Sequence, residues 1–223
     1  MEEIVGQDHL LGKNGIIKRM VDNDHLFSMI LYGPPGIGKT TIASVIGSMF
    51  GLNTFSFNAS TDKKAHLADI IEQAKNYGAL VLIDEIHRMN KDIQDYLLPH
   101  VEQGNIIMIG MTTSNPYHSV NPAIRSRAHV LKLKPIQQLE IIKRMKQVEL
   151  EYSEELTCQL DDDVYEYISQ AANNEIRSAL NALELINMAY KNQKITIEEA
   201  KSVLQEPNLS LDKNEDNYKS KIF

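Results

Sequence analysis

The chain has 223 residues, of which 43% are hydrophobic and 24% are charged, and this composition excludes a disordered protein. Its single cysteine, Cys158, excludes an internal disulfide and fits a reducing cytoplasm. No apolar run approaches the roughly 18 residues that span a bilayer, and the N-terminus lacks a signal-peptide pattern, so we expect a cytoplasmic protein without membrane association.

The net charge of −7 comes entirely from the last part of the chain. Residues 1–135 contain 13 basic and 13 acidic side chains, whereas residues 136–223 contain 10 basic and 17 acidic ones. A protein that holds nucleic acid by bulk charge is expected to be basic. Any contact with DNA is therefore expected to be local, or to come from parts outside this chain.

Short apolar runs alternate with amphipathic stretches through the first 135 residues. This alternation predicts an α/β domain, with a central parallel sheet flanked by helices. The expected strands cover residues 26–32, 54–57, 80–83, 106–111 and 130–133, and the expected helices cover residues 40–50, 66–77 and 91–101.

After Pro135 the pattern is helical, and we expect no further strand. Capping and negative charge are expected from Asp161–Asp163, and Thr196 with Glu199 forms a capping-box pattern. We therefore expect a nucleotide-binding domain over residues 1–135, a small all-α domain over residues 136–206 and a linker or tail over residues 207–223. The expected helices cover residues 137–150, 163–172, 176–191 and 196–204.

Residues 33–41 read GPPGIGKTT, between an expected strand and an expected helix. This spacing and context predict a phosphate-binding loop for ATP. Lys39 would reach the β- and γ-phosphates, and the Thr40 hydroxyl would bind Mg²⁺. The predicted nucleotide-binding residues are Gly33, Pro34, Pro35, Gly36, Ile37, Gly38, Lys39, Thr40 and Thr41.

Residues 79–88 read ALVLIDEIHR, an apolar strand that ends in two acidic residues. Ligands of parallel sheets bind at the carboxyl ends of the strands. Asp84 is therefore a candidate partner of Mg²⁺, and Glu85 is a candidate base for the attacking water. His87 is interpreted as a packing or relay residue beside the site.

Four segments together resemble the replication-associated recombination protein A family, which lies in the clamp-loader clade of AAA+ ATPases. They are GPPGIGKT, VLIDEIHR, IGMTTSNPYHSVNPAIRSRAHV at 109–130 and NNEIRSALNALELI at 173–186. The resemblance runs from about Ile4 to about Leu211. It implies an AAA+ fold with a helical lid, ATP hydrolysis, and a role in DNA replication, recombination and repair at stalled forks. It also implies three partners, which are single-stranded, forked or junction DNA, single-strand-binding protein, and further copies of the chain.

The resemblance also assigns roles to residues of segment 109–130. Thr113 corresponds to the sensor-1 residue near the γ-phosphate, and Asn115 is the alternative. Arg127 corresponds to the arginine finger, which acts in the ATP site of a neighbouring subunit, and Arg125 is instead expected to be a surface or interface partner.

Two further assignments concern the two ends of the resemblance. Arg177 corresponds to sensor 2, which reaches from the lid to the nucleotide, and Val5 lies in the segment expected against the adenine. Asn174 and Glu175 depart from the glycine-containing family pattern, but asparagine tolerates the left-handed backbone that this turn needs. The chain is expected to be a fragment that carries the ATPase core and the lid, without a C-terminal oligomerisation domain.

Three alternative functions remain open from the sequence. A branch-migration motor of the RuvB type shares GPPGxGKT and DEIHR, but it is expected to end in a basic winged-helix domain. A clamp-loader subunit would show Ser-Arg-Cys where this chain has Ser-Arg-Ala at 126–128. An ATP-dependent scaffold without useful hydrolysis is disfavoured by Glu85.

Overall fold

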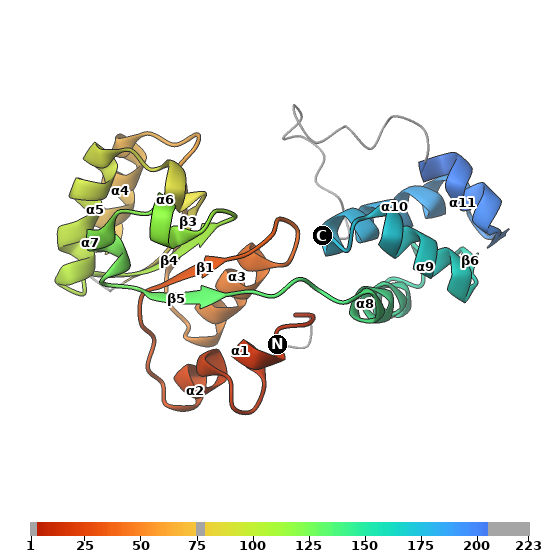
Figure 1. Cartoon of the computed structure of the whole chain (residues 1–223), viewed down its shortest axis with the longest axis horizontal. Coiled ribbons are helices and arrows are strands. Elements are labelled where there is room, and N and C mark those ends of the chain that lie inside the picture. Colours follow the sequence, from red (N-terminus) through yellow and green to blue (C-terminus); the bar gives the residue numbers. More distant parts are fainter. Residues whose placement is uncertain (1–3, 75–78, 205–223) are drawn as a thin grey trace. The chain divides into compact units, whose positions relative to one another are not determined.

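The computed structural model describes residues 4–74 and 79–204 and divides into two compact units, which meet in sequence at Pro135 and Ile136 (Figure 1). The expected tail at 207–223 and the end of the expected helix at 66–77 fall outside the described residues. Within the described residues, no helix combines the length and the apolar character that crossing a membrane requires.

The first unit is built on a five-stranded sheet in which every neighbouring pair of strands is parallel. The strand order is β2-β3-β4-β1-β5. A parallel sheet buried on both faces needs apolar strands, and β1, β3 and β4 are buried along nearly their whole length. The strands are β1 (Met29–Tyr32), β2 (Thr54–Asn58), β3 (Ala79–Asp84), β4 (Ile106–Thr112) and β5 (His129–Lys132).

Helices cover both faces of this sheet. Val81 and Ile83 of β3 belong to one buried cluster with α4 and α5, which lie together on one side in Figure 1. Leu80 lies on the opposite face near α3, since a Cβ added to Gly47 would come within 2.9 Å of its Cδ2 atom. The helical elements of this unit are α1 (Asp8–Leu11), α2 (Ile16–Asp22), α3 (Lys39–Met49), α4 (Lys64–Ala74), the 3₁₀ turn η1 (Ile86–Arg88), α5 (Lys91–Glu102), α6 (Pro116–Ser119) and α7 (Pro122–Arg125).

Strand register brings three strand ends to one edge of the sheet. Tyr32 at the end of β1 is paired with Thr112 at the end of β4, and Ile83 near the end of β3 is paired with Gly110 of β4. Segments that follow β1, β3 and β4 therefore start next to one another. This is the edge at which parallel sheets bind their ligands.

The second unit is helical, with one exception that the sequence did not predict. Its helices are α8 (Gln138–Glu151), α9 (Asp162–Ala171), α10 (Ile176–Ala189) and α11 (Ile197–Leu204). Two strands, β6 (Gln159–Leu160) and β7 (Lys194–Ile195), also pair in parallel. The expectation of no further strand was wrong, because a strand of two residues is too short to show a periodic pattern.

The structure confirms some of the caps and turns that the sequence predicts in the second unit, but not all of them. Thr196 and Glu199 form the expected capping box, since the Thr196 N–H donates to Glu199 Oε2 at 2.8 Å and the Glu199 N–H donates to Thr196 Oγ1 at 3.4 Å. Asn174 adopts the expected left-handed conformation, with φ +58°. Asp161 occupies the N-cap position of α9 without the expected capping bond, and its carboxylate forms an ion pair with Lys194 Nζ at 2.9 Å.

Candidate functional site

The loop between β1 and α3 is the GPPGIG segment at residues 33–38. Gly38 ends the loop with φ +88°, in the left-handed region that favours glycine. Gly33 is buried, and a Cβ there would lie 2.6 Å from Ile37 Cδ1 and 3.0 Å from the carbonyl oxygen of Leu133. Glycine is therefore needed at both positions. The rest of the loop comprises Pro34 and Pro35, which are exposed, Gly36, which is half-buried, and Ile37, which is buried.

Lys39 begins α3 and folds back over this loop. Its Nζ atom donates to the carbonyl oxygens of Gly33 at 3.0 Å and Pro34 at 2.7 Å. Thr40 and Thr41 follow in the first turn and are exposed. Since helix starts present N–H groups and a partial positive charge, the ammonium, the hydroxyls and the amides form a donor set that fits phosphate oxygens.

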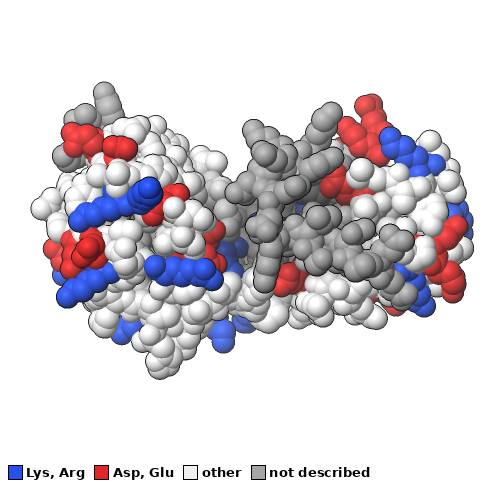
Figure 2. All heavy atoms as spheres, turned by 90° about the horizontal axis from the view of Figure 1, so that it is seen from above, with Lys and Arg blue, Asp and Glu red and all other residues white. Residues whose placement is uncertain are grey.

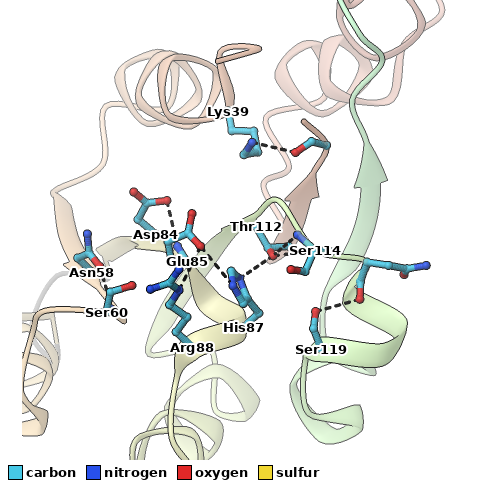
Figure 3. Close-up of polar contacts among 12 residues, drawn as sticks. Lys39, Asn58, Ser60, Asp84, Glu85, His87, Arg88, Thr112, Ser114 and Ser119 are labelled. Carbon is cyan, nitrogen blue, oxygen red and sulfur yellow. Dashed lines mark hydrogen bonds and ion pairs between the residues drawn. The ribbon is translucent and has the colours of Figure 1, made fainter. Parts of the chain in front are cut away.

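Two carboxylates lie at the end of β3. Asp84 is the last residue of the strand, and its Oδ1 atom accepts a hydrogen bond from the Glu85 N–H at 3.0 Å. Glu85 has φ +50° and ψ +41°, a left-handed conformation that costs a residue with a side chain about 1–3 kcal/mol. In Figure 3, both carboxylates point toward the side on which Lys39 lies. The strained turn therefore sets the direction of the Glu85 side chain.

His87 connects Glu85 to the end of β4. Its Nε2 atom lies 3.3 Å from Glu85 Oε2, and its Nδ1 atom lies 2.9 Å from Thr112 Oγ1 (Figure 3). The same oxygen of Glu85 lies 3.8 Å from Arg88 Nε, on a side chain that is 62% exposed. Of the two roles expected for His87, packing or relay, these contacts fit the relay.

Sequence reasoning missed Thr112. This residue is fully buried and ends β4, one residue beyond the expected strand, and its Oγ1 atom also accepts from the Ser114 N–H at 3.0 Å. Thr113 follows it and is exposed, whereas the Asn115 side chain caps α6 by accepting from the Tyr117 N–H at 3.0 Å. The available signal was a polar residue directly after an apolar strand. The sensor role of Thr113 stays a prediction.

A magnesium ion fits the residues predicted for it. Thr40 supplies a hydroxyl and Asp84 a carboxylate, and Mg²⁺ at nucleotide sites is held by one or two protein oxygens together with phosphates and water. In the described part of the chain, no group of three or more His, Cys, Asp or Glu side chains could hold a metal by itself.

Comparison with known proteins identifies the family. The model of the ATPase family associated with various cellular activities (AAA) matches residues 29–135, and the model of the AAA C-terminal domain matches residues 154–220. The chain belongs to the AAA family of ATPases. The α/β architecture expected from the sequence is thereby confirmed, and so is the AAA part of the resemblance inferred from the four motifs.

Curated relatives extend this AAA assignment along nearly the whole chain. Replication-associated recombination protein A from Bacillus subtilis (strain 168) is 42% identical over 97% of this chain and 53% of its own length. The Escherichia coli (strain K12) protein of the same name is 37% identical over 83% of this chain and 43% of its own length. The chain therefore spans about half the length of the curated relatives it matches.

A solved AAA structure shows the same fold. The Thermotoga maritima RuvB Holliday junction branch migration motor has a TM-score of 0.78 and is 22% identical, with 92% of this chain and 70% of that chain covered. At this identity the likeness describes the fold alone.

Arg127, the AAA finger candidate, lies just after α7 at the surface of the first unit. Its Nη1 atom donates to Ala123 O at 2.8 Å and Ser126 Oγ at 3.0 Å, and its Nη2 atom forms an ion pair with Glu102 at the end of α5. The Arg127 side chain is 37% exposed. The guanidinium is therefore accessible from solvent, and its action on a neighbouring subunit stays a prediction.

Arg125 has a different environment. Its Nη1 atom donates to the carbonyl oxygens of Tyr117 at 2.8 Å and Pro116 at 3.2 Å, and its guanidinium lies 5.2 Å from the centre of the Tyr117 ring. These contacts hold α6 against α7. Both arginines bond within the first unit, but Arg125 is half-buried and Arg127 is exposed, which favours Arg127 for a role toward another molecule.

The remaining predicted residues lie at the N-terminal segment and in the second unit. Val5 is half-buried, and the nearby Gln7 amide donates to Lys134 O at 2.8 Å and accepts from Lys134 N at 3.0 Å. This pair of bonds fixes the segment that contains Val5 beside the end of β5. Arg177 is exposed at the second position of α10, in the second unit, and its reach toward the nucleotide stays a prediction.

Proposed function

We propose that this chain binds ATP with Mg²⁺ and hydrolyses it. The observation that supports this best is the shared sheet edge, where the Lys39 loop follows β1 and the Asp84–Glu85 pair ends β3, with only β4 between the two strands. A phosphate cradle and a carboxylate pair at one edge are the two parts that hydrolysis of a nucleoside triphosphate needs.

Each residue of this edge has a defined task in the proposal. Lys39 donates to the β- and γ-phosphates, and Thr40 and Asp84 hold the magnesium ion. Glu85 orients the attacking water and accepts its proton. When bound, Mg²⁺ neutralises charge on the phosphate oxygens.

The predicted partners of this edge complete the proposed ATP site. Thr113 contacts the γ-phosphate, and the use of the Asn115 side chain as a helix cap supports Thr113 over Asn115. Val5 packs against the adenine. The first unit is the nucleotide-binding domain, and the helical unit that follows Pro135 is the lid that carries Arg177.

We further propose that the protein acts in replication-associated recombination and repair at stalled forks in the bacterial cytoplasm. The support is the 42% identity to replication-associated recombination protein A over 97% of the chain. Single-stranded, forked or junction DNA, single-strand-binding protein and further copies of the chain are the proposed partners. On the face shown in Figure 2, blue and red side chains are interspersed, so the DNA contact is expected to be local.

The alternatives have less support. A RuvB-type motor rests on a structural likeness at 22% identity, whereas the recombination proteins match at 37–42%. A clamp-loader subunit has no specific observation in its favour. A scaffold that does not hydrolyse ATP is disfavoured because Glu85 is present and held by His87.

The first test measures ATP binding by calorimetry in the presence of Mg²⁺. Lys39→Ala should weaken binding about a hundredfold, because a charge-assisted hydrogen bond contributes about 1.5–3 kcal/mol. Lys18→Ala is the matched control, since Lys18 pairs with Asp22 on the surface of α2. Equal affinity of wild type and Lys39→Ala would reject the proposed phosphate site.

The second test measures turnover. Glu85→Gln should keep ATP affinity and lower the rate about 10²–10⁴-fold, because an amide cannot accept the proton of water. Asp95→Asn, an exposed change on α5, is the control. Rates should be followed with rising protein concentration, since the proposed finger acts between subunits. A fully active Glu85→Gln variant would remove Glu85 from the chemistry.

A further inference from the structure

We propose that His87 is a positioning residue that couples the loop after β4 to Glu85 through Thr112. The inference rests on the proposed hydrolysis of ATP, because Glu85 is the base in that proposal. It adds His87 and Thr112 to the residues that support the reaction. Neither belongs to the phosphate loop or to the Asp84–Glu85 pair.

The contacts form a continuous row with a defined direction. The Ser114 N–H donates to Thr112 Oγ1 at 3.0 Å, and Thr112 Oγ1 lies 2.9 Å from His87 Nδ1. His87 Nε2 then lies 3.3 Å from Glu85 Oε2. An ionised carboxylate only accepts hydrogen bonds, so Nε2 carries the proton that points to Glu85. The single proton of the Thr112 hydroxyl has two acceptors within reach, the Ser114 carbonyl oxygen at 3.3 Å and His87 Nδ1 at 2.9 Å. The closer one is Nδ1, which therefore accepts from the hydroxyl.

A neutral imidazole suits this task better than a charged one. An imidazolium beside Glu85 would hold the carboxylate as an ion pair and weaken it as a proton acceptor. A neutral Nε2–H donor orients the carboxylate and leaves its charge available for water. The proposed coupling therefore requires the tautomer of His87 that carries its proton on Nε2.

The backbone around His87 is fixed by packing that is independent of these hydrogen bonds. Ile86 is buried against Gly110 of β4, and a Cβ on Gly110 would come within 2.6 Å of Ile86 Cδ1. This close approach seats η1 directly on β4, next to Thr112. His87 is consequently brought to Thr112 by the fold itself.

Burial distinguishes His87 from Arg88, the other basic side chain near Glu85. Thr112 is fully buried and the His87 side chain is 17% exposed, whereas the Arg88 side chain is 62% exposed and its contact with Glu85 is longer, at 3.8 Å. Exposed ion pairs constrain geometry weakly. Within the direction that the left-handed turn gives the Glu85 side chain, His87 therefore constrains the carboxylate more strongly than Arg88 does.

The other end of the row lies in the loop that carries Thr113 and Asn115, the two sensor candidates. A shift of Ser114 when this loop meets a phosphate changes the bond to Thr112, and hence the orientation of His87 and Glu85. This chain of hydrogen bonds thus links contact with the γ-phosphate to the orientation of the Glu85 carboxylate.

The kinetic test uses two variants of Thr112 and one of His87. Thr112→Val keeps the shape and removes the hydroxyl, and His87→Phe keeps a ring and removes both nitrogens. Each should lower kcat about tenfold to a hundredfold while the Kd for ATP stays the same, because a base displaced by about 1 Å loses that much rate. Thr112→Ser restores the hydroxyl and should recover most of kcat. His66→Ala, which removes a histidine 3.1 Å from the Asp62 carboxylate on the surface, is the matched control and should not change kcat.

Nitrogen NMR of the His87 ring in the wild-type chain tests the assignment without any turnover. The expected spectrum is that of a neutral ring protonated at Nε2, and Thr112→Val should perturb it. A ring protonated at Nδ1, or an imidazolium, would overturn the inference. So would wild-type kcat in both Thr112→Val and His87→Phe, or an ATP affinity that falls in step with kcat.

These outcomes are distinct from failure of the proposed function. If the wild-type chain binds no ATP, or if Glu85→Gln is fully active, the proposed hydrolysis fails whatever the His87 spectrum shows. If wild type hydrolyses ATP and Glu85→Gln does not, normal kcat in the Thr112 and His87 variants overturns the coupling alone.

Discussion

The two units place their buried polar side chains in different ways. Among the described residues, these side chains are Gln7 and Thr112 in the first unit and Ser169 and Asn187 in the second. In the first unit, Thr112 bonds to His87 and the Ser114 backbone at the candidate site. In the second, Asn187 Oδ1 accepts from the Cys158 N–H at 2.9 Å, which ties the start of β6 to α10.

This difference separates polar groups that serve a site from polar groups that serve a fold. Buried polar groups are expensive unless they are satisfied, so each one has a structural partner. The partners of Thr112 are the His87 side chain, which is proposed to take part in the reaction, and the backbone of Ser114. Near Asn187, they are backbone groups of the same helical unit. A change at Thr112 should therefore alter turnover, and a change at Asn187 should alter stability.

The largest expected effect concerns Arg127, in the first unit. In the assembly that we propose, Arg127→Ala should lower kcat about 10³–10⁵-fold, because an arginine finger stabilises charge in the transition state. The Kd for ATP should stay nearly the same, and so should the melting temperature. Steady-state kinetics and calorimetry check this, with Arg19→Ala on the surface of α2 as the control.

Mixed assemblies then distinguish action between subunits from action within one chain. Arg127→Ala mixed with Lys39→Ala should recover part of the activity, because some junctions join an intact loop to an intact finger. If Arg127 acted on its own chain, every subunit in the mixture would carry a broken site. No recovery at any mixing ratio, in subunits shown to co-assemble, would count against the assignment.

An intermediate effect is expected from the second unit. Asn187→Ala should lower the free energy of unfolding by about 1–3 kcal/mol, because it leaves the buried Cys158 N–H without its acceptor. Chemical denaturation followed by circular dichroism measures this change. Asn23→Ala, which removes an exposed contact at the end of α2, is the control. A large loss of ATP affinity in Asn187→Ala with normal stability would break the comparison.

The smallest expected effect concerns Glu149, on α8. Its Oε2 atom accepts from the Tyr165 hydroxyl, while its Oε1 atom is buried without a hydrogen-bond partner in the described part of the chain. Burial raises the pKa of Glu149 above its ordinary value of 4.5. The folded state then binds the proton more tightly than the unfolded state, so stability falls as the pH rises from 4.5 through the raised pKa.

Glu149→Gln should remove this loss of stability at higher pH, since the amide carries no charge and its oxygen still accepts from the Tyr165 hydroxyl. The melting temperature of the variant should exceed that of wild type at neutral pH, and the difference should shrink toward acid pH. Scanning calorimetry across this range tests the sign, with the exposed Glu154→Gln as the control. A variant less stable than wild type at neutral pH would contradict the expectation.

The parts of the fold that the sequence could predict are those set by local patterns. Apolar runs located all five strands of the large sheet, and the phosphate loop follows from contiguous residues whose backbone carries the chemistry. The β6–β7 pair was missed because each strand has two residues. Periodicity needs a longer run than that.

The candidate site was predictable only as far as its motifs are contiguous. The His87–Thr112 contact joins residues 25 positions apart and depends on the register of β3 against β4. The pairing of Arg127 with Glu102 likewise depends on how α5 packs beside α7. Contacts that depend on strand register or on helix packing cannot be read from the spacing of residues along the chain.

The Arg127–Glu102 ion pair has a consequence for the assembly that we propose, in which Arg127 acts on a neighbouring subunit. Because the guanidinium already has an anionic partner in its own chain, a contact with a phosphate of a neighbour exchanges one anion for another. The net attraction that Arg127 adds between subunits is therefore the small difference between two similar interactions. Affinity between subunits and speed of the reaction thus become separable quantities, and one side chain can be decisive for the second while remaining nearly neutral for the first.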